Sequence, residues 1–88
     1  MDINYELYKV FYYVASTLSF SEASKQLFIS QSAVSQSIKA LEKKLDQTLF
    51  IRSTKKVRLT TEGEILLRHI EPAISLIKRG ESQLLDVG

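Results

Sequence analysis

The sequence has 88 residues, 44% of them hydrophobic and 25% charged, with three glycines and one proline. This composition excludes a disordered chain, which lacks the apolar surface to offset conformational entropy, and the length allows one domain. The absence of cysteine excludes disulfides and thiolate metal sites and indicates a reducing compartment. The apolar run at residues 10–15 is too short to span a membrane, and the acidic start is unlike a signal peptide. We therefore expect a cytoplasmic protein without a membrane partner.

The net charge of +2 hides a segregation of charge along the chain. Residues 1–24 and 59–88 each have a net charge of −2, whereas residues 25–58 carry eight basic and two acidic side chains, a net charge of +6. A basic block in a near-neutral domain is the pattern expected of a face that binds a polyanion. A solvated lysine-rich surface is the alternative, which composition alone favours.

The first predicted element is an amphipathic helix over residues 4–18, with Asp2 or Asn4 as its N-cap. Tyr5, Tyr8 and Tyr12 form a second stripe that one core cannot also bury. They are either half-exposed surface residues or a surface that packs against a partner. The buried stripe of the helix consists of Ile3, Leu7, Val10, Phe11, Val14 and Leu18.

Two more helices are predicted before residue 46. Ser19 and Ser21 are alternative caps for a short helix over residues 22–28. Ser30 is the predicted N-cap of a longer helix over residues 31–45, because the residues on either side of it have the spacing of a hydrophobic staple. The inward residues are Ala23, Leu27 and Phe28 in the first helix and Val34, Ile38, Leu41 and Leu45 in the second, with Ile29 and Val34 as the staple.

Residues 49–52 and 57–60 are short strand-like runs, and the polar loop 53–56 between them predicts a two-stranded wing. A long helix is then predicted from residue 62 to beyond residue 78, capped by Thr60 or Thr61. If it reaches Gln83 it is about 33 Å long, more than a domain of this size needs to cover its core. Pro72 should bend this helix without breaking it.

The predicted fold is mainly α: a winged helix-turn-helix of three helices and a two-stranded wing, followed by a long dimerisation helix. The face of helix 31–45 opposite its buried stripe carries hydrogen-bonding side chains, with Glu42 only at the border. In a DNA major groove, Gln can pair with adenine and Lys with guanine, and the helix N-terminus attracts phosphate. We therefore favour DNA reading by this face, which consists of Ser32, Ser35, Gln36, Lys39 and Lys43.

The wing carries Arg52, Lys55, Lys56 and Arg58, which suit contacts with phosphate or the minor groove. The two arginines lie within the strands and are alternatively structural partners of Glu62 or Glu64, so the two lysines are the stronger DNA candidates.

Catalysis finds no support in the sequence. The single histidine, His69, has no cysteine with which to form a nucleophile–base pair, and the three glycines form no phosphate-binding loop. We predict no enzyme activity, cofactor or metal, and expect His69 at the surface or in a dimer interface.

These residues closely resemble the N-terminal DNA-binding domain of the LysR-type bacterial transcriptional regulators. The resemblance extends from Leu7 to Gly63 and includes the segments 19–24 and 29–38, Leu41-Glu42, Leu49-Phe50, Arg52 and Leu59-Thr60. Three positions depart from common family residues: Ser32 for proline, Ser24 for alanine and Asp46 for glycine. Asp46 tolerates the left-handed conformation that often ends a helix, so none of these departures weakens the resemblance.

The resemblance implies a homodimer or higher homo-oligomer. This oligomer would bind double-stranded DNA at an interrupted palindrome. Residues 1–60 would form the DNA-binding domain and residues 61–88 the linker helix. The family's effector-binding domain is absent, so we expect a fragment, and a small-molecule effector would act only through that missing domain. The predicted base-reading residues are Gln31, Ser32, Ser35, Gln36 and Lys39; the backbone contacts are Ser21, Lys25, Ser30, Lys43, Arg52, Lys55 and Lys56; the dimer contacts are Tyr8, Tyr12, Leu66, Ile70, Ala73, Ile74 and Ile77.

Two other readings stay open at this stage. One is a winged-helix module that binds protein through the tyrosine surface and the long helix. The other is a winged-helix regulator of a different family, whose wing is the main reader of DNA.

Overall fold

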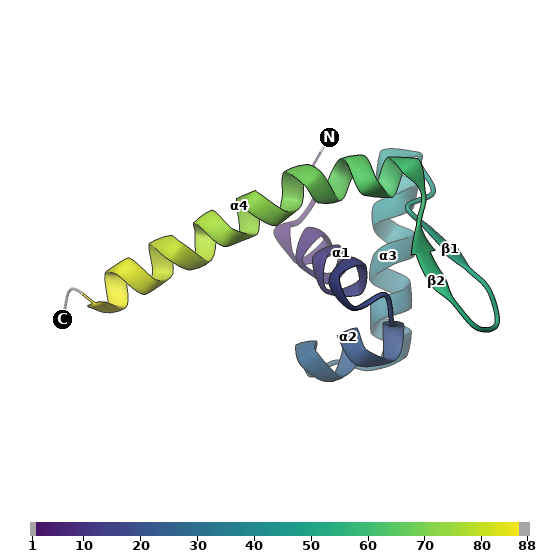
Figure 1. The fold of residues 1–88 in the computed structure, drawn as a ribbon, viewed down its shortest axis with the longest axis horizontal. Coiled ribbons are helices and arrows are strands. Elements are labelled where there is room, and N and C mark those ends of the chain that lie inside the picture. Colours follow the sequence, from purple (N-terminus) through teal and green to yellow (C-terminus); the bar gives the residue numbers. More distant parts are fainter. Residues whose placement is uncertain (1, 87–88) are drawn as a thin grey trace.

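The computed structural model describes residues 2–86. Helices α1 (Tyr5–Thr17), α2 (Phe20–Leu27) and α3 (Gln31–Leu45) are followed by strands β1 (Phe50–Arg52) and β2 (Val57–Leu59) and by helix α4 (Thr61–Asp86). The first three helices pack against one another, and α4 crosses α1 before it projects away from them (Figure 1). The predicted mainly helical winged helix-turn-helix with a long final helix is confirmed. Within residues 2–86, no helix has the length and hydropathy to cross a membrane.

Short polar side chains set the start of the first three helices. Asn4, Ser19 and Ser30 accept hydrogen bonds from the backbone N–H groups of Glu6, Glu22 and Ala33 at 2.8, 3.0 and 3.0 Å. The choice of Ser19 over Ser21 starts α2 at Phe20, two residues earlier than predicted. Left-handed residues end all three helices: Leu18, Phe28 and, as predicted, Asp46. The sequence pattern places Leu18 in the buried stripe of the first helix, but as the C-cap of α1 it leaves the helical stripe and is 46% exposed.

Phe28 corrects one prediction made from the helical period. The helical period predicts that Phe28 faces inward, but its side chain is 93% exposed. Because Phe28 closes α2 with a φ of 59°, it leaves the helical stripe and points away from the core. Ala23 is buried and Leu27 half-buried, as predicted.

The core lies where α1, α2 and α3 meet, and the wing is anchored to it. Leu49 and Phe50 are 1% and 5% exposed, and the Phe50 ring packs between those of Phe11 and Phe20, at centroid distances of 5.4 and 6.0 Å. The other buried apolar residues of this cluster are Val10, Val14, Ala15, Ala23, Val34, Ile38 and Leu41.

Two polar side chains fix the ends of the wing. Glu42, at the border of the predicted reading face, accepts hydrogen bonds from the backbone N–H groups of Leu49 (2.7 Å) and Phe50 (3.3 Å). Thr60 donates to the carbonyl of Thr48 (2.6 Å) and accepts from the N–H of Gly63 (3.0 Å), so Thr60 rather than Thr61 caps α4. The strands pair antiparallel, with Ile51 opposite Arg58. Because its carboxylate holds the backbone at the start of the wing, Glu42 is a structural residue of the wing.

Helix α4 is continuous through Pro72. Its apolar residues divide into an inner and an outer set. Ile74 is only 3% exposed within a single protomer, and Leu66 and Ile70 pack partly against the core. The prediction that Ile74 belongs to an uncovered seam is therefore wrong, because α1 and α4 pack together along this side. The outer set is Ile65, Leu76, Ile77, Leu84 and Leu85, which are 43–83% exposed.

Candidate nucleic-acid interface

Helix α3 separates an apolar side from a polar side, as its sequence predicts. Val34, Ile38 and Leu41 are buried on the inner side. Ser35 is half-buried on the opposite side, and the other residues predicted to read bases, Gln31, Ser32, Gln36 and Lys39, are exposed. The first turn of α3 has no acidic residue, and its free backbone N–H groups favour an anion there. The side chains offer donors and acceptors to any molecule that lies along the helix.

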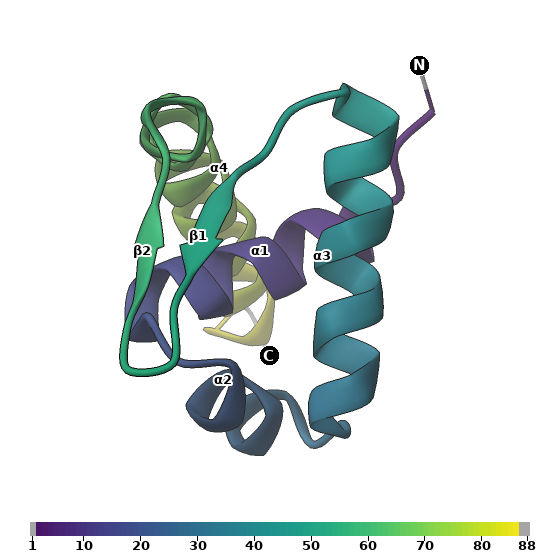
Figure 2. The same cartoon turned by 90° about the vertical axis from the view of Figure 1, so that its right-hand side faces the viewer.

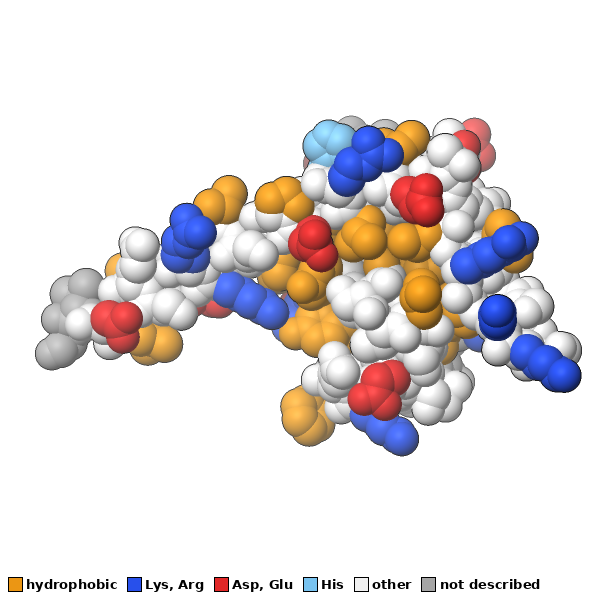
Figure 3. All heavy atoms as spheres, in the orientation of Figure 1, with side chains coloured by type: hydrophobic (Ala, Val, Ile, Leu, Met, Phe, Trp, Pro, Cys, Tyr) orange, Lys and Arg blue, Asp and Glu red, His pale blue; other side chains and the backbone are white. Residues whose placement is uncertain are grey.

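The N-terminal end of α3, helix α2 and the loop of the wing lie toward the same end of the molecule (Figure 2). Lys25 on α2, Lys43 on α3 and Lys55 and Lys56 in the wing are all exposed. Basic side chains gather over the β-hairpin, at the end of the molecule opposite the free end of α4 (Figure 3). The fold thus brings the wing and the reading helix to one side, although they are separate in sequence.

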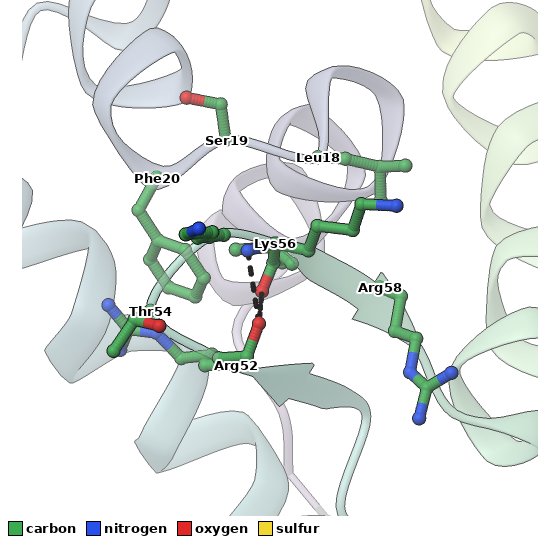
Figure 4. A pocket seen from close by; sticks show the side chains of 10 residues that line it. Leu18, Ser19, Phe20, Arg52, Thr54, Lys56 and Arg58 are labelled. Atoms are coloured by element: carbon green, nitrogen blue, oxygen red, sulfur yellow. Dashed lines mark hydrogen bonds between the residues drawn. The ribbon is translucent and has the colours of Figure 1, made fainter.

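The wing loop is held by its own hydrogen bonds. The N–H of Ser53 donates to the carbonyl of Lys56 (2.8 Å), and the N–H of Lys56 donates to the Ser53 hydroxyl (3.1 Å). A groove runs between this loop and the junction of α1 and α2, where Leu18, Ser19 and Phe20 line it (Figure 4). The loop therefore presents Lys55 and Lys56 from a closed turn.

Arg52 differs from the other basic residues of the wing because it contacts both α2 and α3. Its guanidinium carbon lies 3.8 Å from the centroid of the Phe20 ring, and its Nη1 donates to the Ser35 hydroxyl at 3.4 Å. Arg58, on the neighbouring strand, points away from Phe20 (Figure 4). The alternative that Arg52 pairs with Glu62 or Glu64 is therefore replaced by contacts with Phe20 and Ser35.

Two predicted backbone contacts also have structural roles. The Ser30 side chain is the N-cap of α3 and is exposed, so its hydroxyl proton stays free to donate outward. Ser21 is half-buried, and its carbonyl accepts a hydrogen bond from the Ser24 hydroxyl at 2.7 Å. That bond explains how serine is accommodated at position 24, where the side chain is 8% exposed.

Helix α4 carries exposed apolar residues along its length, and the sequence pattern identified only some of them. Ile65, near the start of the helix, is 48% exposed and Leu76 is 62% exposed, and neither was predicted as a contact. The predicted contacts Ile77 and Ala73 are also exposed. Tyr8 and Tyr12 are half-buried on α1, with the Lys78 ammonium 5.8 Å from the Tyr12 ring. His69 is exposed, and its Nδ1 lies 2.9 Å from the Ile65 carbonyl. Within the described residues, no group of three acidic, His or Cys side chains is placed to hold a metal ion.

Comparisons of the sequence with family models and with curated proteins agree on one family. Residues 5–64 match the model of the bacterial regulatory helix-turn-helix protein, lysR family. The HTH-type transcriptional regulator PerR of Escherichia coli is 42% identical over 74 residues, which are 84% of this chain and 25% of that protein. HdfR of Salmonella newport is 46% identical over 66 residues, 75% of this chain and 24% of that protein. The chain thus spans about a quarter of the length of these curated relatives.

Solved structures agree with this result. The BenM_DBD/catB site 1 DNA complex matches with a TM-score of 0.87 and 25% identity, covering 97% of this chain and 94% of that chain. The CbnR_DBD–DNA complex has a TM-score of 0.82 and 26% identity, with coverages of 97% and 98%. Full-length LysG from Corynebacterium glutamicum with bound effector Arg has a TM-score of 0.83 and 30% identity, with coverages of 96% and 29%.

Proposed function

The chain belongs to the lysR family of bacterial regulatory helix-turn-helix proteins, and on that premise we propose that it binds double-stranded DNA as a sequence-specific transcriptional regulator. The observation that carries the proposal is the polar side of α3, which exposes Gln and Lys next to a basic wing. The DNA complexes of BenM_DBD and CbnR_DBD, whose folds match along nearly the whole chain, support it. The proposal implies a cytoplasmic location and no enzyme activity.

In this proposal, α3 lies in the major groove. Gln31, Ser32, Ser35, Gln36 and Lys39 are the base-reading candidates, and Gln36 is central because its amide matches the donor and acceptor of adenine. The backbone contacts are Ser21 and Lys25 on α2, Ser30 and Lys43 at the ends of α3, and Arg52, Lys55 and Lys56 in the wing. They would supply affinity without direct base reading.

We further propose that residues 1–60 form the DNA-binding unit and residues 61–88 a linker segment through which two copies associate; residues 1, 87 and 88 lie outside the described residues. At 26 residues α4 is about 39 Å long, and its outer apolar residues are 43–83% exposed within the protomer. Leu76, Ile77 and Ala73 are the best-placed contacts, with Ile65 beside His69. A two-fold dimer would set two copies of α3 against two half-sites of a palindrome.

The test begins with selection of bound sequences from a random DNA pool. The proposal predicts an enriched, interrupted palindrome and an affinity that falls steeply with salt. A winged-helix module that binds protein would enrich no sequence and show no steep salt dependence. A regulator that reads DNA mainly with its wing would change its preference on wing substitutions and keep it on α3 substitutions.

Gln36→Ala tests the reading face within that experiment. Removal of a good bidentate base contact should reduce the difference in binding free energy between cognate and substituted operators by about 1–3 kcal/mol. Nonspecific binding should change little. Gln47→Ala is the matched control, because Gln47 is exposed beyond the end of α3. An equal loss of affinity for every operator variant would show that Gln36 does not read a base.

A further inference from the structure

The side chain of Arg52 joins three elements that the proposed function treats separately. Arg52 ends β1, its guanidinium lies over Phe20, the first residue of α2, and its Nη1 reaches Ser35 on α3. The contact with Ser35 connects positions 17 residues apart in sequence. It joins a side chain of the wing to a side chain of the reading helix, whereas the Glu42 carboxylate of α3 accepts from backbone N–H groups at the start of the wing.

The aromatic platform under Arg52 is part of the buried core. Phe20 is 5% exposed, and its ring forms a T-shaped contact with the ring of Phe50, which in turn packs against the fully buried Phe11. A planar guanidinium can stack on such a ring while its N–H groups remain available at the edge, whereas a lysine ammonium cannot reproduce this arrangement. The stacking therefore limits the orientations in which Arg52 can donate to Ser35.

The direction of this hydrogen bond has a consequence for the chemistry of Ser35. A guanidinium only donates, so the Ser35 oxygen must accept, and the single hydroxyl proton remains free to be donated elsewhere. Ser35 lies on the polar side of α3, where a bound duplex would be. A hydroxyl that donates there suits acceptors of the major groove, namely purine N7, guanine O6 or thymine O4, and does not suit the amino groups of adenine or cytosine.

We infer that Arg52 is a positioning residue for base recognition: stacked on Phe20, it holds the Ser35 hydroxyl as a donor toward an acceptor on a base edge. This inference rests on the proposed DNA binding and deepens it. It assigns Arg52 a part in sequence preference, in contrast to the simple phosphate contact that its charge suggests. A substitution that keeps the charge of Arg52 but loses its stacking on Phe20 separates the two roles. It should reduce base discrimination if Arg52 positions Ser35, and should leave discrimination unchanged if Arg52 only contacts phosphate.

The experiment is a double-substitution cycle on the selected operator and on a panel with single base changes. Ser35→Ala should reduce discrimination at one position of each half-site by about three- to tenfold, the effect of one neutral hydrogen bond. Arg52→Lys keeps the charge and should reduce discrimination at the same position, while the slope of affinity against salt stays unchanged. The double variant should lose no more at that position than Ser35→Ala alone. Arg58→Lys is the matched control and should leave discrimination intact.

Thermal unfolding of each variant accompanies the cycle. If Arg52→Lys does not fold, Arg52→Met replaces it, because its apolar stem can still cover Phe20 but has no donor for Ser35. The inference is overturned if the Arg52 variants weaken binding to every operator by one common factor, or if the losses from Arg52 and Ser35 add independently at that position. A wild-type chain that selects no sequence would overturn the proposed function together with the inference, so the two failures are distinguishable.

Discussion

Gly63 provides a sharp test of how α4 is attached to the wing. A Cβ atom built at this residue would overlap the carbonyl oxygen of Leu49 and lie 2.8 Å from Leu59 Cδ2. The carbonyl of Leu49 cannot easily move, because it accepts a hydrogen bond from the Thr60 N–H at 3.0 Å. Gly63→Ala should therefore force the wing away from the start of α4.

The expected size follows from three contributions to the free energy of unfolding. Overpacking of a tight site costs about 1–3 kcal/mol, and weakening the Thr60–Leu49 hydrogen bond costs about 1 kcal/mol. The better helix propensity of alanine returns at most about 1 kcal/mol. The net destabilisation of about 1–3 kcal/mol should lower Tm by about 5–20 °C in a domain of this size.

Gly80→Ala is the matched control, because it makes the same change on the same helix with no atom within 4 Å of the new Cβ. It should not lower Tm, and helix propensity should raise stability by up to about 1 kcal/mol. Both variants are unfolded by heat and followed by circular dichroism at two protein concentrations, which separates folding from association. A Gly63→Ala protein that melts at or above the wild-type temperature would refute the close approach of α4 to Leu49.

Three further predictions concern the wing and the dimer. Glu42→Ala should lower stability by about 2 kcal/mol in urea unfolding, because two half-buried N–H groups lose their acceptor, while Glu42→Gln retains an oxygen and should cost less. Lys55→Ala combined with Lys56→Ala should lower affinity for all sequences and flatten the log–log salt dependence by about 0.9 per lost phosphate contact, and an unchanged slope would place the wing away from DNA. Leu76→Lys should give a folded monomer in sedimentation equilibrium, because Leu76 is 62% exposed in the protomer, and a variant dimer as stable as the wild type would exclude Leu76 from the interface.

The sequence by itself determined the local structure of this protein. Helix α3 begins and ends at the predicted residues, because a serine cap, a regular apolar period and a residue that tolerates positive φ are all local signals. The segregation of basic residues and the polar side of α3 were equally readable, since a helix places residues three and four apart on one side. The same signals were sufficient to identify the family.

Tertiary structure decided which residues on these elements are buried and which are exposed. Helix α4 has more apolar residues than one side can hold, and only the position of α1 determines that Ile74 is buried and Leu76 exposed. Phe28 could not be placed from its hydrophobicity, because a left-handed backbone at the end of α2 takes it off the helical stripe. The partners of Arg52 lie 32 and 17 residues earlier in the chain, on α2 and α3. Contacts of that kind depend on how the elements pack, which no local period of the sequence encodes.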